Sequence, residues 1–278
     1  MLIRIKVEER IVFQSVKYVL HENVTNIYRT FSITRYELIA DIRSSKLGFF
    51  WNFASPAINI FTYWFVFGYV LHRKSVGDIP YIVWMLGGMV VWLFISPCIT
   101  SGCSAIYKKV DVITKMKFPI SILPLTVVME KLFNHLCVMT IVIAVFLAKG
   151  YYPTVYWFGL LYYLLCAILF AFALSLTTSV LNMIARDTKK LISSCMRLLL
   201  YFTPILWSPS RLPEWMQNVV KCNPIYYIVQ GYRDCFFYHK GFMAYSWSMA
   251  WFWGITLFLF FLGSFLMCKF RTKFIDMI

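Results

Sequence analysis

The sequence predicts an all-α, polytopic membrane protein with six transmembrane helices. Two observations carry this prediction. Of the 278 residues, 60% are hydrophobic and only 14% are charged, which is more apolar surface than one water-facing core can bury. The basic residues lie between long apolar stretches, so we interpret the formal charge of +15 as a topology signal and not as a nucleic-acid-binding surface.

Residues 1–46 contain no apolar stretch long enough to cross a membrane. From Ile27 to Ile42, apolar and aromatic residues recur at helical spacing among charged ones, which predicts an amphipathic helix on the inner membrane surface. A helix packed against the protein's own spans gives the same pattern, so both alternatives stay open. We therefore divide the chain into a cytoplasmic interface segment, 1–46, and a transmembrane domain, 47–278.

The six expected spans follow in order and are separated by polar loops. Each reaches the roughly 17 to 25 residues that cross a hydrocarbon core of about 30 Å, and the longer third and fourth spans are expected to tilt. They cover residues 49–71, 79–103, 121–148, 155–183, 191–207 and 245–268. In the outer loop, about 208–244, Pro209, Pro213 and Pro224 interrupt short apolar pieces, which predicts re-entrant or interfacial helices.

Basic residues are divided unequally between the two sides of these spans. Nineteen lie in residues 1–46, 104–120, 184–197 and 269–278, whereas seven lie in the alternate loops. Because cytoplasmic loops are enriched in Lys and Arg, the positive-inside rule predicts that both termini are cytoplasmic.

The sequence offers little enzyme or metal chemistry. It contains no phosphate-binding G-x-x-x-x-G-K-[ST] loop, no G-x-S-x-G elbow and no H-E-x-x-H pair, so we expect no catalytic residue, metal or cofactor in this chain. Any ATP-driven work needs a separate ATPase that binds ATP and magnesium. Of the eight cysteines only Cys222 and Cys235 share a polar loop, and two free thiols are favoured there over a disulfide, whose geometry the sequence does not give.

Two polar loops and one group of ionisable residues each have a functional and a structural interpretation. The loop 106–119, IYKKVDVITKMKFP, suits a short docking helix, and also a solvated positive-inside loop. The loop 184–190, IARDTKK, suits a partner contact or a plain helix connector. Glu130, Lys131 and His135 lie in the third expected span, where ionisable groups mark function unless they sit at the membrane interface.

Segments from most of the chain carry a resemblance to a known family. On these segments the sequence resembles the permeases of ABC-2 type polysaccharide exporters, most closely those of the teichoic acid translocation (TagG/TarG) type. They keep the family's order over about 230 residues and read KLGFFWNFASP (46–56), YWFVFG (63–68), WMLGGMVVWLF (84–94), ITKMKFPISILP (113–124), FAFALSLTTSVLNMIARD (170–187), MRLLLYFTPILWSP (196–209), NPIYYIVQGYRD (223–234) and KFRTKFIDMI (269–278).

The resemblance implies a homodimer of this chain bound to two copies of a separate ABC ATPase (TagH/TarH type). Such a complex would export undecaprenyl-diphosphate-linked wall teichoic acid across the cytoplasmic membrane of a Gram-positive bacterium, in contact with membrane lipids and with no nucleic acid. The alternative is export of another lipid-linked glycan, O-antigen or capsule, by the same architecture. A membrane-embedded transferase is disfavoured because no paired acid and base is evident, and a passive channel would be indifferent to ATP.

The resemblance also assigns expected roles to residues. Aromatic rings stack on sugars and also form interface belts, and we favour the belt for most of them. The residues expected to couple to the ATPase are Lys108, Lys109, Asp111, Lys115, Lys117, Phe118, Arg35 and Glu37. The residues expected along the substrate path, mainly in the first and fifth spans, are Tyr63, Trp64, Phe67, Trp92, Tyr201, Trp207, Tyr226, Tyr227, Arg43 and Arg233.

Overall fold

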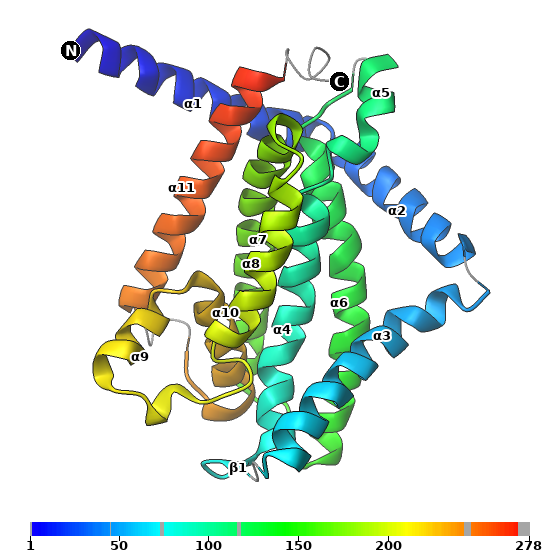
Figure 1. Ribbon diagram of the computed structural model, residues 1–278, viewed down its shortest axis with the longest axis vertical. Coiled ribbons are helices and arrows are strands. Elements are labelled where there is room, and N and C mark those ends of the chain that lie inside the picture. The colour runs from blue at the N-terminus through cyan, green and yellow to red at the C-terminus, as the bar shows by residue number, and fades with distance from the viewer. Residues whose placement is uncertain (1, 45, 73–74, 116–117, 242–245, 272–278) are drawn as a thin grey trace.

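The computed structural model describes residues 2–44, 46–72, 75–115, 118–241 and 246–271. Within these ranges the chain is helical apart from its loops and one short antiparallel hairpin, β1 (Ser75–Val76) with β2 (Ile79–Pro80). Gly77 turns this hairpin with a φ of +59°, a conformation that glycine adopts without strain. The predicted all-α class is confirmed (Figure 1).

Five helical stretches in the described part of the chain are long and apolar enough to cross a membrane, and they correspond to five of the expected spans. They are Gly48–Val70 (α3, Gly48–Tyr63, continued by a π-helical segment, Trp64–Val70), Tyr81–Gly102 (α4), Ile122–Ala148 (α6), Val155–Ile184 (a 3-10 turn, Val155–Phe158, then α7, Gly159–Ile184) and Ser246–Phe270 (α11).

Helix α4 lies at the centre of the bundle and packs against α6 and α7, while α11 packs on the other side of α7 (Figure 1). Most of α4 is buried, as expected for a helix that is apolar on all sides. Helix α3 lies at the periphery: no residue of 48–70, all of which the structure describes, is buried. The stretch 48–70 is also the less hydrophobic of the two, so the more hydrophobic helix forms the core and the less hydrophobic one faces outward.

The sixth expected span, 191–207, forms α8 (Thr188–Phe202), which lies beside α4 and α7. Its 15 residues extend about 22 Å, which is shorter than a hydrocarbon core of about 30 Å. The predicted end at residue 207 is wrong because Pro204 cannot continue a helix and forces Thr203 into an extended conformation (ψ 134°).

Helices α1 (Leu2–Thr25) and α2 (Ile27–Ser44) lie at the end of the bundle where α11 ends (Figure 1). In α1, Glu22 accepts a hydrogen bond from the backbone N–H of Ser121 at 3.1 Å, which ties α1 to the start of α6. In α2, the side that packs on α6 carries Thr30 and Thr34. The bulky residues Ile27, Tyr28, Phe31 and Tyr36 are exposed, and Leu38, Ile39 and Ile42 are half-buried. The protein therefore covers only part of the apolar stripe that predicted an interfacial helix.

The same end of the bundle carries a 3-10 turn (Tyr107–Lys109) and α5 (Val110–Lys115). The outer loop holds a 3-10 turn (Pro209–Arg211), α9 (Glu214–Lys221), α10 (Pro224–Arg233) and a π-helical segment (Asp234–Tyr238). Helix α10 begins at Asn223, whose side chain accepts from the N–H of Ile225, and packs among α4, α7 and α11. The proline-rich loop thus folds back as short helices, as predicted.

Gly231 is the close-approach point between α10 and α7. A Cβ at this position would overlap the ring of Tyr163, and the backbone of α10 cannot move away because it is packed on both sides. We expect Gly231→Ala to lower the free energy of unfolding by about 1–3 kcal/mol despite the better helix propensity of alanine, measured as a lower midpoint of thermal unfolding in detergent. Gly254→Ala in α11 is the matched control, because nothing lies within 4 Å of its Cβ. Equal midpoints for the two variants would contradict this packing.

Candidate functional site

A polar cavity of about 400 Å³ lies between α3, α4 and α8. Each helix contributes residues of one face: residues spaced by four in α4, residues spaced by three or four in α8, and one tyrosine near the end of α3. The lining residues are Tyr63, Trp92, Ser96, Thr100, Ser193, Met196, Arg197 and Leu200. The expected path residues Tyr63 and Trp92, from different spans, are thus brought together.

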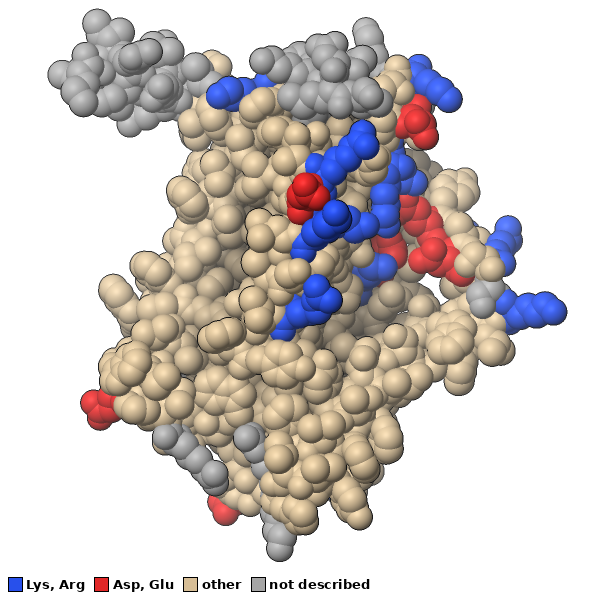
Figure 2. All heavy atoms as spheres, viewed as in Figure 1, with Lys and Arg blue, Asp and Glu red and all other residues tan. Residues whose placement is uncertain are grey.

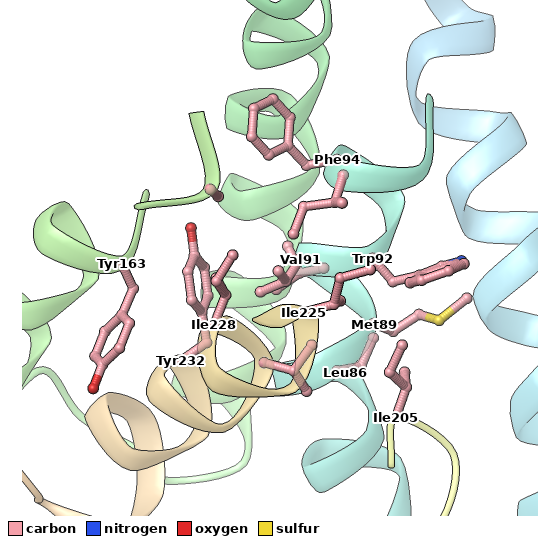
Figure 3. Close-up of a cluster of buried hydrophobic side chains, with 14 of the residues drawn as sticks. Leu86, Met89, Val91, Trp92, Phe94, Tyr163, Ile205, Ile225, Ile228 and Tyr232 are labelled. Atoms are coloured by element: carbon pink, nitrogen blue, oxygen red, sulfur yellow. The ribbon is translucent and has the colours of Figure 1, made fainter. Parts of the chain in front are cut away.

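The cavity has two ends of different chemistry. Helices α4 and α8 run in opposite directions (Figure 1), so Thr100 near the end of α4 and Ser193 near the start of α8 lie toward one end of the cavity, and Trp92 and Leu200 lie toward the other. Figure 3 shows the Trp92 ring at the edge of the buried cluster, directed away from Ile228 and Tyr232. Hydroxyls therefore line the end nearer the termini, and aromatic rings line the deeper end.

Arg197 places a cation at the polar end of the cavity. Its Nη2 donates to Ser194 Oγ at 3.2 Å, and among the described residues no carboxylate pairs with it. Because Thr188 begins α8 nine residues earlier, Arg197 lies about 14 Å along the helix. Lys190, seven residues before Arg197, lies on the same face. Figure 2 shows Lys and Arg side chains in a band that runs from the upper end toward the middle of this face.

Other expected path residues of the first and fifth spans lie close to the cavity without lining it. Trp64 and Phe67 are half-buried and pack against the core next to α4. Tyr201 is exposed, four residues beyond Arg197, and its carbonyl accepts from Trp207 Nε1 at 2.7 Å. These residues extend the aromatic lining beyond the deeper end of the cavity.

The remaining expected path residues do not meet there. Tyr227 is buried, with its ring 5.0 Å from that of Phe252, and Tyr226 lines a separate cavity of about 140 Å³ between α9, α10 and α11. Arg43 is exposed near the end of α2. The structure thus separates the outer-loop tyrosines and Arg43 from the cavity.

Arg233, expected in a wall of the path, is instead completely buried. Its guanidinium donates to the carbonyls of Pro204 and Ile205, both at 2.7 Å, and to that of Trp84 at 3.3 Å, and it stacks 3.5 Å from the centre of the Trp84 ring. The chain leaves the helical conformation before Pro204, so the carbonyls of Pro204 and Ile205 have no helical partner and Arg233 supplies one, whereas the Trp84 carbonyl lies inside α4 and gains a second donor. Burial lowers the pKa of Arg233 to about 9, which leaves it protonated at neutral pH.

Asp234 follows Arg233 and is buried as well. Its Oδ1 accepts from Gln230 Nε2 at 3.0 Å, and its Oδ2 has no hydrogen-bond partner in the described part of the chain. Burial raises the pKa of Asp234 to about 6. The carboxyl group is then still largely ionised at neutral pH, but no ion pair joins it to Arg233 in the described residues, so the hydrogen bonds to the three carbonyls hold the guanidinium in place.

The residues expected to couple to the ATPase gather at the end of the bundle near the termini. Lys109 Nζ lies 2.7 Å from Glu37 Oε1, so the loop 106–119 and α2 contact each other through an ion pair. The other members differ in exposure: Lys108, Asp111, Lys115 and Arg35 are exposed, Phe118 is half-buried, and Lys117 lies outside the described residues.

The loop 184–190 also reaches this end. The Arg186 guanidinium lies 5.2 Å from the centre of the Tyr107 ring, which joins the loop before α8 to the start of the coupling segment. Lys190 and Asp187 form an exposed pair at 3.3 Å, as a plain helix connector would. The structure thus links α2, the segment 107–115 and α8 by successive contacts.

The ionisable residues of the third span do not face the cavity. Glu130 is buried and pairs with Lys131, and His135 Nε2 lies 3.3 Å from the hydroxyl of Tyr232 in α10. Lys131 neutralises Glu130 and His135 contacts Tyr232 inside the protein, which favours a structural role for all three residues. Cys222 is exposed and Cys235 is buried, and both thiols are free.

Sequence reasoning missed four polar residues of the cavity. Arg197 was counted as a residue of a cytoplasmic loop, and Ser96, Thr100 and Ser193 were taken as ordinary span residues. The signal was present: Ser96 and Thr100 continue the four-residue spacing that begins at Trp92, and Ser193 and Arg197 have the same spacing. Such a polar stripe in an apolar helix indicates a face turned toward water or protein.

The fold and the cavity define a polytopic membrane protein of the transport class, with a polar, aromatic-lined space between its helices. The chain belongs to the ABC-2 type transporter family, whose model matches residues 28–237. It is therefore a multi-pass subunit of the cell membrane that works with an ABC ATPase.

Two individual proteins are also similar to most of this chain. The O-antigen export system permease protein RfbA of Klebsiella pneumoniae is 28% identical over 242 residues, 86% of this chain and 91% of that protein. The protein of the same name from Myxococcus xanthus is 28% identical over 213 residues, 75% of this chain and 80% of that protein.

Proposed function

We propose that this chain is the permease subunit of an ABC exporter that moves a lipid-linked polysaccharide across the cell membrane. The observation that carries the proposal is the cavity between α3, α4 and α8, because it combines aromatic rings with hydroxyls and one cation. Aromatic rings bind the apolar faces of sugars, and hydroxyls and cations bind their polar edges and phosphates. The relatives whose names specify O-antigen export support the same class of substrate.

Two polymers are candidates for this substrate. An O-antigen-type glycan is favoured by the printed names of the relatives, which extend over most of both chains. Wall teichoic acid, linked to undecaprenyl diphosphate, is favoured by the resemblance of the segments from Lys46 to Asp234. A cation at the polar end of the cavity fits both, because both expected substrates carry a lipid phosphate; the teichoic polymer adds a chain of further anions.

Assembly follows from the surfaces that a single chain leaves uncovered. Helix α3 exposes large apolar residues, among them Phe50, Trp51, Phe61 and Phe65, and a second copy of the chain would cover part of this surface. The basic end with the segment 107–115 would receive the ATPase, two copies for the two permeases. This end then faces the cytoplasm, with both termini, in agreement with the excess of Lys and Arg there.

Contacts between the elements at this end suggest how ATP hydrolysis changes the position of the helices that line the cavity. The ATPases would press on α5 and on the 3-10 turn before it. The Lys109–Glu37 ion pair would pass the movement to α2, and the contact between Tyr107 and Arg186 would pass it to α8, which forms one wall of the cavity.

The export reaction itself tests the proposal. The permease is reconstituted in liposomes with its ATPase, and the ATP-dependent transfer of a labelled O-antigen-type or teichoic-acid-type lipid-linked glycan is measured. We expect transfer of one polymer class, and Tyr63→Ala to reduce its rate about fivefold, the equivalent of ~1 kcal/mol for one lost aromatic contact. Tyr152→Ala, which removes an exposed tyrosine in the loop after α6, outside both the cavity and α3, is the control. Absence of ATP-dependent transfer of either polymer would refute the function.

A further inference from the structure

We propose that the polar end of the cavity binds the diphosphate of a lipid-linked sugar through Arg197, and that the first sugar lies deeper, against Tyr63 and Trp92. This rests on the proposed function and specifies the part of the substrate that the cavity recognises. Arg197 is the new element, since sequence reasoning assigned no role to it.

The guanidinium of Arg197 has unused donors. It carries five N–H groups, and its one hydrogen bond to protein in the described residues goes to Ser194 Oγ. The Arg197 side chain is exposed at the cavity and has no carboxylate partner in the described residues, so an anion in the cavity would supply the missing counter-charge. The planar fork of guanidinium matches two phosphate oxygens at once, which a lysine ammonium does not.

Arg197 lies within the length of the spans. Ser96, which shares the cavity with it, precedes the end of α4 by six residues, so the polar end lies about 9 Å below that end. A guanidinium at such a depth is costly unless it faces protein, water or an anionic headgroup, and the cavity provides that space. Lys190, on the same face of α8 and nearer its start, is paired with Asp187 at 3.3 Å and supplies no free cation.

The order of chemistry along the cavity selects a sugar diphosphate over an ordinary phospholipid. Beyond the hydroxyls of Ser96, Thr100 and Ser193, the cavity continues to the rings of Trp92 and Tyr63, which an acyl chain does not require and a sugar ring does. Its volume of about 400 Å³ accommodates a headgroup with a sugar and not a polymer. The site would therefore recognise the junction between lipid and glycan.

A binding measurement that does not depend on export tests this inference. The full chain in phosphatidylcholine nanodiscs is titrated with farnesyl diphosphate linked to N-acetylglucosamine, and binding is followed by quenching of tryptophan fluorescence and by native mass spectrometry. We expect Arg197→Gln to weaken binding at least about tenfold, and Arg197→Lys to weaken it less, because lysine keeps the charge and loses the fork. Lys149→Gln, the same loss of charge on the exposed loop after α6, should bind as the unsubstituted chain does.

Each outcome decides the inference. Equal affinities of the unsubstituted chain and Arg197→Gln would overturn it, as would competition by phosphatidylglycerol as effective as that by the diphosphate, because the site would then take any lipid phosphate. Farnesyl diphosphate without the sugar should bind more weakly, and equal binding would overturn the role of the aromatic end. If the unsubstituted chain exports the polymer and Arg197→Gln binds the ligand normally, the proposed function stands and the diphosphate site is refuted. If Arg197→Gln loses binding but the unsubstituted chain shows no ATP-dependent export, the diphosphate site stands and the proposed function is refuted.

Discussion

Replacement of Arg233 by glutamine is expected to destabilise the protein more than any other single substitution proposed above. The glutamine amide cannot reach three carbonyls from different elements, so the carbonyls of Pro204 and Ile205, which lie beyond the end of α8, would remain buried without donors. Loss of one partner of a buried charged network costs about 3–5 kcal/mol. We expect a large fall in the midpoint of thermal unfolding and in the yield of monodisperse protein in detergent.

Arg197→Gln is the matched control for Arg233→Gln, since it makes the same chemical change at an exposed arginine. Its free energy of unfolding should change by no more than about 0.5 kcal/mol. Gly88→Ala offers a second approach, because its Cβ would lie 2.5 Å from the Arg233 Nη2 and displace the guanidinium. If Arg233→Gln unfolds at the same temperature as Arg197→Gln, the carbonyl network contributes little to the fold.

The spans were predictable because hydropathy over some 20 residues depends little on tertiary structure. The boundaries of five helices agree with the expected spans to within a few residues, whereas α8 ends early. There, an apolar window extended across Pro204, although a proline and the residue before it mark a helix end by local sterics alone. The information was in the sequence, and averaging of hydropathy concealed it.

The arrangement of the site was less predictable, because it depends on which faces of distant helices meet. Tyr63 and Trp92 were both selected for their aromatic character, and Tyr227 was selected on the same ground, yet only the first two share the cavity. The two arginines show the same limit: Arg233 lay in an outer loop of the sequence and is buried, while Arg197 was counted as a loop residue and lines the cavity. Composition identifies charged and aromatic residues, and packing decides their environment.

Lys108→Glu combined with Lys115→Glu is expected to abolish the association of the permease with its ATPase. Both lysines are exposed at the end of the bundle near the termini, and in the described part of the chain neither forms an ion pair, so they are free to meet acidic residues of a partner. Reversal of two charges at such an interface places like charges together, which costs several kcal/mol, or on the order of a hundredfold or more in affinity. Co-purification and permease-stimulated ATP hydrolysis measure the effect.

Lys109→Glu should act differently, because Lys109 is already paired with Glu37 at 2.7 Å. The substitution would repel α2 from the 3-10 turn, so we expect the ATPase to bind but its hydrolysis to lose coupling to export. Glu37→Lys in the same chain restores the pair with reversed charges and should recover coupling, whereas it should not rescue the Lys108 and Lys115 variant. Lys149→Glu, at the opposite end of α6, controls for charge alone. If Lys109→Glu and its rescue behave alike, the contact between α2 and the segment 107–115 does not transmit the movement, and the exposed lysines alone form the coupling surface.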